Sequence, residues 1–424
     1  MAQPAIFKII SVVLFFIIFS TAVGAASGEI VTGTGNDSTT GQIQPYSIKL
    51  FKPSLDSIHS STILDVINGP NGEVLFATSL GLSTYDGTQW STSRVTHNNL
   101  SLGLMDDYVT AIEFDNNSNL WIGYSGGLQI FNGRYYQVIR DQQILKDTRI
   151  TDLQRWNDDM WIATGNAGIH RYRNGNWTWF QPYAPGGPGF YYATSMALDP
   201  ESPNSLDIAT DNEGLWIVKS PDDPVVFEKL AGMDDPAGLL DQVRQDPFGG
   251  VYFFNESMVV HYSTGSGFNQ VLTTVNLSNV RLDINDIAAS PSGKLYIATD
   301  DGIYIWMDNT VFRHIGGFEG IGSSPIVRTV NIDKFNRVWF STPDVVGYYL
   351  DPADSGPLIP VEIVTATTIP TVSIPSLTVD ITATPSPQIT PQGSSTGILG
   401  PVLDPIESAI NAITTYFGFK LFSL

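Results

Sequence analysis

Polar side chains recur at one position of a four-residue frame that the chain repeats seven times. Each frame holds two apolar residues three positions apart, as in 63–66 and 109–112. The residues just before the second apolar position are small or polar: Asp65, Ala111, Asp152, Ser195, Gln242, Asp286 and Thr329. Arranged around an axis, they would form a ring able to bind a cation or a hydroxyl-rich ligand, with the carboxylates as ligands or acid/base groups. The alternative, which we favour, is that they hydrogen-bond the backbone of neighbouring repeats and water.

Aromatic residues cluster in the long connection between the third and fourth repeats. Here 185–189 reads Pro-Gly-Gly-Pro-Gly, a scaffold that can hold flat apolar rings at the surface. Such rings suit sugar faces or a protein partner. The predicted ligand-binding residues are Tyr183, Phe190, Tyr191 and Tyr192. For Trp177 and Trp179 we favour packing at the edge of the sheet.

Groups for acid/base or metal chemistry are sparse. The chain has no cysteine, and its five histidines are scattered without metal-ligand spacing, so no metal or cofactor is predicted. His97 near Asp106, and the ring residues Asp152 and Asp286, are the weak catalytic candidates. No nucleophile elbow or phosphate-binding loop is present. We therefore do not expect an enzyme.

Composition excludes several classes of partner. Over 424 residues, 42 Asp and Glu face 21 Lys and Arg, a net charge of −21. An acidic chain is a poor match for nucleic acid or an anionic membrane surface. With 39 Gly, 26 Pro and 11% aromatic residues, turn-rich β structure is expected instead of helical bundles.

A seven-fold repeat sets the predicted fold. Apolar strings such as 120–123 (Leu-Trp-Ile-Gly) and 295–299 (Leu-Tyr-Ile-Ala-Thr) recur every 40–46 residues. Each lies in a unit of four short strands separated by Asn, Asp and Gly turns. This period and strand count predict an all-β, seven-bladed β-propeller over 46–352. The last unit lacks a fourth strand, because prolines follow 346–350, so we expect the N-terminal strand 46–51 to close the ring.

These repeats resemble a known family. Segments 119–133 (NLWIGYSGGLQIFNG) and 294–305 (KLYIATDDGIYI) are similar to the two-component regulator propeller repeat, as are 160–172 and 74–90 with its Tyr-Asp-Gly. In that family such propellers often form the periplasmic ligand-sensing part of histidine-kinase receptors. The sequence here contains no kinase, receiver or helix-turn-helix segment, so phosphotransfer is not expected of it.

The N-terminus indicates export. Lys8, an apolar run over 9–19 and small residues at 22–26 predict a signal peptide over 1–26, the alternative being an uncleaved anchor. A flexible segment is expected over 27–45. Six glycosylation sequons are compatible with a surface glycoprotein: Asn36, Asn99, Asn116, Asn176, Asn255 and Asn276.

The C-terminal part differs in composition. Between 360 and 392, Thr, Pro and Ser make 17 of 33 residues, which predicts an extended linker over 353–397; an additional strand is the alternative. In 398–424, apolar residues at helical spacing predict an amphipathic segment. It would dock to a partner or the cell envelope, anchor in a membrane, or pack on the propeller.

The sequence therefore predicts an exported, surface-displayed propeller, sensor-like or adhesin-like, that binds a glycan or an envelope protein through its loop face. One alternative is a propeller lyase or hydrolase acting on a polysaccharide or peptide-like substrate. The other is a structural component of a cell-surface layer, in which 398–424 mediates self-association.

Overall fold

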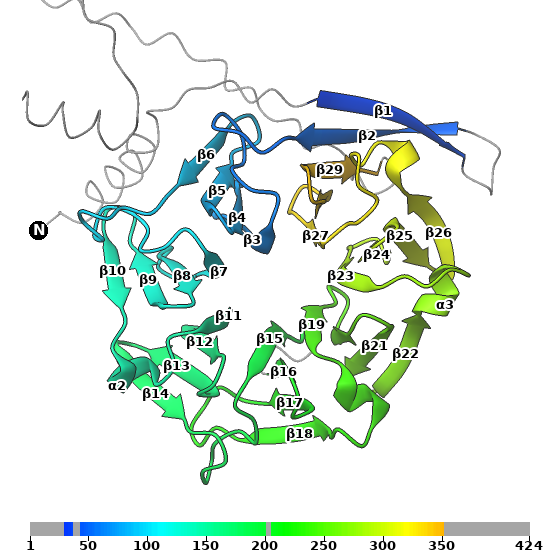
Figure 1. Ribbon diagram of the computed structural model, residues 1–424. Helices are drawn as coiled ribbons and strands as arrows, with labels where there is room; N and C mark the ends of the chain where they lie inside the picture. The colour runs from blue at the N-terminus through cyan, green and yellow to red at the C-terminus, as the bar shows by residue number, and fades with distance from the viewer. Residues whose placement is uncertain (1–28, 37–42, 201–204, 352–424) are drawn as a thin grey trace, which may run out of the picture. The chain divides into compact units, whose positions relative to one another are not determined.

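Short strands of four to nine residues account for most of the described chain. The computed structural model describes residues 29–36, 43–200 and 205–351. The chain divides into two units, 1–359 and 360–424, and all described residues lie in the first. Within them, the strands form seven antiparallel sheets, arranged as blades around an axis (Figure 1).

The blades follow the repeats in order. Blade 1 contains β3 (Ile63–Asn68), β4 (Val74–Thr78), β5 (Gly81–Tyr85) and β6 (Trp90–Ser93), and blade 2 contains β7 (Val109–Phe114), β8 (Leu120–Tyr124), β9 (Gly127–Phe131) and β10 (Tyr136–Ile139). Blade 3 contains β11 (Ile150–Trp156), β12 (Asp159–Thr164), β13 (Ile169–Arg173) and β14 (Asn176–Phe180), and blade 4 contains β15 (Ala193–Leu198), β16 (Leu206–Thr210), β17 (Leu215–Val218) and β18 (Phe227–Ala231). Blade 5 contains β19 (Gln242–Gln245), β20 (Val251–Phe254), β21 (Met258–Ser263) and β22 (Gly267–Thr273), and blade 6 contains β23 (Ile284–Ala289), β24 (Leu295–Thr299), β25 (Gly302–Met307) and β26 (Thr310–Ile315). Blade 7 contains β27 (Thr329–Ile332), β28 (Arg337–Ser341), β29 (Val346–Leu350), β2 (Ile43–Phe51) and β1 (Glu29–Asn36).

Helices are short and lie in connections. Among the described residues, the α-helices are α2 (Gln142–Leu145) and α3 (Thr274–Leu277), and 3-10 turns cover Pro236–Leu239 and Gly317–Glu319. The first strand of each blade borders the axis, so residues on these strands are the ones brought together at the centre (Figure 1).

Turn residues explain why the strands stop where they do. In the β7–β8 turn, Asp115 Oδ1 accepts the amides of Asn117 and Asn119, both at 2.9 Å, and Oδ2 accepts the Trp121 indole N–H at 3.2 Å. At the start of β9, Gly127 has a φ of 134°, and a Cβ there would lie 2.6 Å from the carbonyl oxygen of Ile139. Only glycine fits that close approach.

The core consists of apolar layers between adjacent blades. One layer, for example, packs Trp121 and Leu128 of blade 2 against Ile150, Leu153 and Ile162 of blade 3. Apolar side chains on both faces of a strand are thus covered, which explains the consecutive apolar residues in each string.

The N-terminal strand closes the ring, as predicted. β2 pairs with β29 in register from Ser47 opposite Leu350 to Phe51 opposite Val346. Phe51 is fully buried and lies 5.1 Å from Trp90 of blade 1, so it joins the last blade to the first. The seven-bladed fold is confirmed.

One strand was not expected. Within 27–45, predicted as a flexible segment, β1 pairs with β2 along its whole length, from Glu29 opposite Leu50 to Asn36 opposite Ile43. Pattern reasoning missed it because Thr32 to Asn36 is rich in Gly and Thr and lacks apolar alternation. The predicted signal peptide, linker and C-terminal segment lie outside the described residues.

Candidate functional site

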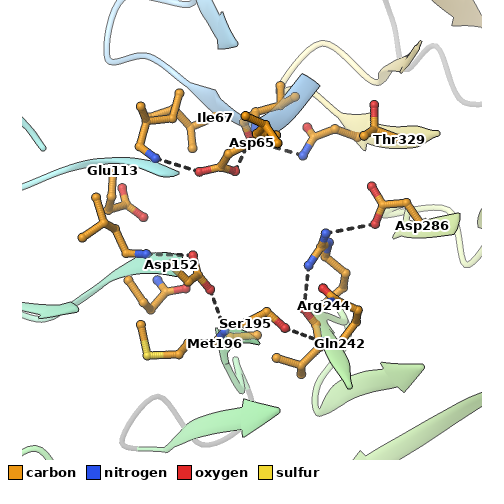
Figure 2. Close-up of a pocket in the computed structure, with 18 of the residues that line it drawn as sticks. Asp65, Ile67, Glu113, Asp152, Ser195, Met196, Gln242, Arg244, Asp286 and Thr329 are labelled. Carbon is orange, nitrogen blue, oxygen red and sulfur yellow. Dashed lines mark hydrogen bonds and ion pairs between the residues drawn. The ribbon is translucent and has the colours of Figure 1, made fainter. Parts of the chain in front are cut away.

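A cavity of about 450 Å³ lies on the axis of the ring, lined by the first strands of all seven blades. The polar residues predicted to face the channel all line it: Asp65, Asp152, Ser195, Gln242, Asp286 and Thr329 (Figure 2). They come together because the same position of the repeated frame is placed toward the axis in every blade.

Three aspartates bridge neighbouring blades. Asp65 accepts the amide of its own neighbour Val66 at 2.7 Å and that of Ile112 in the next blade at 2.8 Å. Asp152 does the same with Leu153 at 2.7 Å and Met196 at 2.6 Å. Each carboxylate therefore fixes the first strands of two blades to each other.

Asp286 and Ser195 accept the remaining backbone amides of this ring. Asp286 accepts the amides of Ile287 at 2.9 Å and Val330 at 3.1 Å, and Ser195 Oγ accepts that of Val243 at 2.8 Å. Three aspartates and one serine thus satisfy the amide at the second apolar position of all seven frames. Because an unpaired buried amide is costly, this explains the residue types without invoking a ligand. The hydrogen bonding agrees with the interpretation that we favoured.

A second set of side chains, one position before the ring residues, also hydrogen-bonds to neighbouring blades. Thr110 Oγ1 donates to the carbonyl of Ile150, and Thr151 Oγ1 to that of Ala193, both at 2.7 Å. Asn285 Nδ2 donates to the carbonyl of Val327 at 2.8 Å. The inner wall is therefore held by side chains as well as by apolar packing.

Two charged residues of the cavity were missed from sequence. Glu113 and Arg244 line the cavity from the position directly after the second apolar residue, one residue beyond the end of the four-residue frame. Arg244 pairs with Asp286, the guanidinium nitrogen lying 3.0 Å from Oδ1. Each of them lies two positions after a residue predicted to face the axis, and therefore on the same face of the strand. This spacing could have identified both residues from the sequence.

Burial dominates the electrostatics of the cavity. It raises the pKa of Asp65 to about 6 and that of Asp152 to about 7, outweighing the amide hydrogen bonds that lower them. Burial likewise raises the pKa of Glu113 to about 7 and raises that of Asp286. For Arg244, burial disfavours the charge, but the nearby carboxylates, Asp286 first, outweigh it and raise the pKa.

The aromatic residues predicted to bind ligand lie in the connection between β14 and β15, and they divide into exposed and buried residues. Tyr183 and Tyr191 are 60% and 47% exposed, and their ring centroids lie 5.1 Å apart. Tyr192 is half-buried. Phe190 was predicted to bind ligand, but it is fully buried and packs on Trp216 at 5.6 Å, between blades 3 and 4. Its place in the blade interface makes it a core residue.

The other catalytic candidates are not brought together. His97 and Asp106 are both exposed, and no hydrogen bond or ion pair between them is seen in the described part of the chain. Asp106 accepts the amide of Tyr108 at 2.9 Å, while its neighbour Asp107 pairs with Arg94 at 2.6 Å. Both acids are thus engaged in shaping their own loop.

Most sequon asparagines lie at the surface. Asn99, Asn116, Asn176 and Asn276 are exposed, Asn255 is half-buried, and Asn36 ends β1. Within the described residues, no helix is long and apolar enough to cross a membrane, and no group of three or more His, Asp or Glu side chains is placed to hold a metal ion.

Comparison with known proteins bears on the fold. No protein-family model matches the chain, and no curated protein matches it. The chain is similar to the extracellular domain of the one component system BT4673 from B. thetaiotaomicron, with a TM-score of 0.57 and 19% identity over 70% of this chain and 39% of that chain.

Two further solved structures show the same likeness. The extracellular domain of the hybrid two component system BT3049 from B. thetaiotaomicron has a TM-score of 0.56 and 21% identity, covering 68% of this chain and 40% of that one. A streptogramin B lyase has a TM-score of 0.56 and 14% identity, covering 72% of this chain and 97% of that one. The chain thus spans about two fifths of the length of the two B. thetaiotaomicron chains. The resemblance of the repeats to regulator propellers therefore holds for the fold: the chain is a seven-bladed β-propeller similar in fold to these extracellular domains.

Proposed function

We propose that this protein is an exported, sensor-like or adhesin-like module that binds a glycan on its loop face. The observation that carries the proposal is the pair Tyr183 and Tyr191, two exposed rings 5.1 Å apart and inclined at 48°. Tyrosine offers an apolar face for a sugar ring and a hydroxyl for its substituents.

The pair is held in place before any ligand arrives. The Tyr183 amide donates to the carbonyl of Pro188, and the Gly168 amide to that of Tyr191, both at 2.8 Å. Tyr183 has a φ of 56°, a left-handed conformation that costs a non-glycine residue about 1–2 kcal/mol. Strained residues of this kind gather at binding sites, where preorganisation lowers the entropic cost of association.

Export and surface display are supported by two features. The N-terminal segment has the pattern of a signal peptide, and the Thr/Pro-rich 353–397 has that of a stalk. Two of the similar structures are extracellular domains of sensors, which agrees with a ligand-sensing role.

The test compares glycan-array binding of the full-length chain with that of Tyr183→Ala/Tyr191→Ala. Loss of both rings should weaken binding at least about tenfold, since each aromatic contact contributes on the order of 1 kcal/mol. The matched control is Tyr108→Ala/Tyr135→Ala, which removes two tyrosines that are each 46% exposed in blade 2 and its preceding loop. Equal binding by the two double variants, or no glycan bound by the wild type, would contradict the proposal.

A further inference from the structure

The hydrogen bonding of the central cavity leaves β19 with unused polar groups. Gln242 and Arg244 are two positions apart on this strand, so both face the axis. The seven ring amides are already satisfied by Asp65, Asp152, Asp286 and Ser195. Gln242 is half-buried, yet its side chain forms no hydrogen bond with any described residue. An amide that could make several hydrogen bonds thus faces the cavity without a protein partner.

Arg244 also keeps donors available. Its guanidinium has five N–H groups. One nitrogen donates to the carbonyl of Val243 at 3.0 Å, and another lies 3.0 Å from Asp286. The side chain is 40% exposed, and it lines the cavity, so its remaining N–H groups are accessible from there.

Acceptors lie on the opposite wall. Figure 2 shows Asp65 and Asp152 on strands across the cavity from Arg244. Each of their oxygens accepts one backbone amide and retains a second lone pair. These carboxylates are therefore fixed in position and still able to accept a hydrogen bond from a ligand.

We propose that the central cavity binds a small, uncharged, polyhydroxylated molecule of about monosaccharide size, with Gln242 and Arg244 donating and Asp65 and Asp152 accepting. A hydroxyl group donates and accepts, so one ligand satisfies both walls. The cavity volume of about 450 Å³ falls in the range of small-molecule sites. This site is separate from the tyrosine pair and does not depend on it.

Charge argues against an ionic ligand. Arg244 is balanced by Asp286, and an anion would meet Asp65, Asp152 and Glu113. With pKa values raised to about 6 and 7, Asp65 and Asp152 are not both fully ionised at neutral pH, so the wall does not require a cation. A neutral hydroxyl can form a hydrogen bond with either a protonated or an ionised carboxyl, because it both donates and accepts.

The experiment measures ligand binding to the full-length chain by saturation-transfer NMR at pH 7. The probes are glucose, galactose, mannose, arabinose and inositol, with glycine as the zwitterion and putrescine as the cation. We expect at least one neutral probe to bind, and Gln242→Leu to weaken it about tenfold, the value of one hydrogen bond in a buried site. Gln242→Leu removes no intramolecular hydrogen bond, so the fold should persist. Arg244→Lys keeps the charge beside Asp286 but loses the planar fork, and should weaken binding similarly.

Two controls make the outcome decisive. Gln137→Leu makes the same change at an exposed position of β10 and should leave binding unaltered. Tyr183→Ala/Tyr191→Ala should also bind the cavity ligand normally, which separates this proposal from the loop-face one. Binding of putrescine or glycine alone, binding of no neutral probe, or a Gln242→Leu affinity equal to that of Gln137→Leu would overturn the inference.

Discussion

Asp152 in blade 3 accepts the backbone amide of Met196 in blade 4 at 2.6 Å, while its other oxygen accepts the amide of Leu153 at 2.7 Å. One carboxylate therefore fixes two neighbouring first strands at the axis. Asp65 and Asp286 repeat this arrangement between blades 1 and 2 and between blades 6 and 7.

Asp152→Ala should destabilise the propeller substantially. The change leaves two amides without acceptors, and each buried unpaired group costs about 1–3 kcal/mol, so we expect a loss of about 2–6 kcal/mol in the free energy of unfolding. Urea denaturation followed by tryptophan fluorescence measures it. Asp56→Ala, at an exposed site, is the control and should change stability by less than about 0.5 kcal/mol. A matching effect at the two sites would refute the bridging role.

Asp207 should make the protein less stable as pH rises. It is fully buried in β16 with no hydrogen bond to either oxygen, at the position that Trp121, Trp161 and Trp339 occupy in other blades. Burial, and then the charge of Asp199, raises its pKa well above the usual value. The folded state therefore binds this proton more tightly than the unfolded state, and stability is lost as pH rises from about 4.

Asp207→Leu removes this dependence. We expect its melting temperature to exceed that of the wild type at pH 7.5, with a smaller difference at pH 4, where the wild-type carboxyl is protonated. Differential scanning calorimetry at both pH values provides the comparison. A difference that does not grow with pH would show that ionisation of Asp207 is not the cause.

Phe51→Ala should open the ring. The ring centroid of Phe51 lies 5.3 Å from that of Tyr85 and 5.1 Å from that of Trp90, both in blade 1. It lies 6.1 Å from the ring centroid of Trp339 in blade 7. Truncating a buried phenylalanine costs about 3–5 kcal/mol. Limited proteolysis should then cleave near β2 and β29 before other strands, whereas Lys52→Ala, at the exposed next position, should be digested like the wild type. Uniform digestion of Phe51→Ala would argue against a closing role for this strand.

The ion pair between Lys294 and Asp351 should show strong coupling. Their charged atoms are 3.0 Å apart and the side chains are 5% and 4% exposed. Either Lys294→Met or Asp351→Leu removes one side of this buried ion pair and should cost about 3–5 kcal/mol, while the double variant should recover much of that loss. A double-mutant cycle on the free energy of unfolding measures the coupling, and additive losses would mean that the two residues act independently.

Much of the architecture can be predicted from the sequence because it depends on local patterns. The 40–46-residue period, the turn residues between apolar strings and the prolines after Leu350 lead to seven blades and to closure by the strand that ends at Phe51. The repeated frame also identifies the polar side chains that line the cavity, since equivalent positions of a repeat face the axis alike.

Hydrogen bonds from the ring residues to neighbouring repeats were expected, but their exact partners could not be predicted, because they depend on how one blade sits against the next. No spacing in the chain indicates that Asp152 accepts the amide of Met196, 44 positions away. The same geometry decides that Phe190 is core while Tyr191, one residue later, is exposed. The sequence by itself determined the repeat, the strands and the closing partner. The tertiary structure decided which polar groups are paired across blades and which, like Gln242, have no hydrogen-bond partner among the described residues, because pairing requires the packed ring.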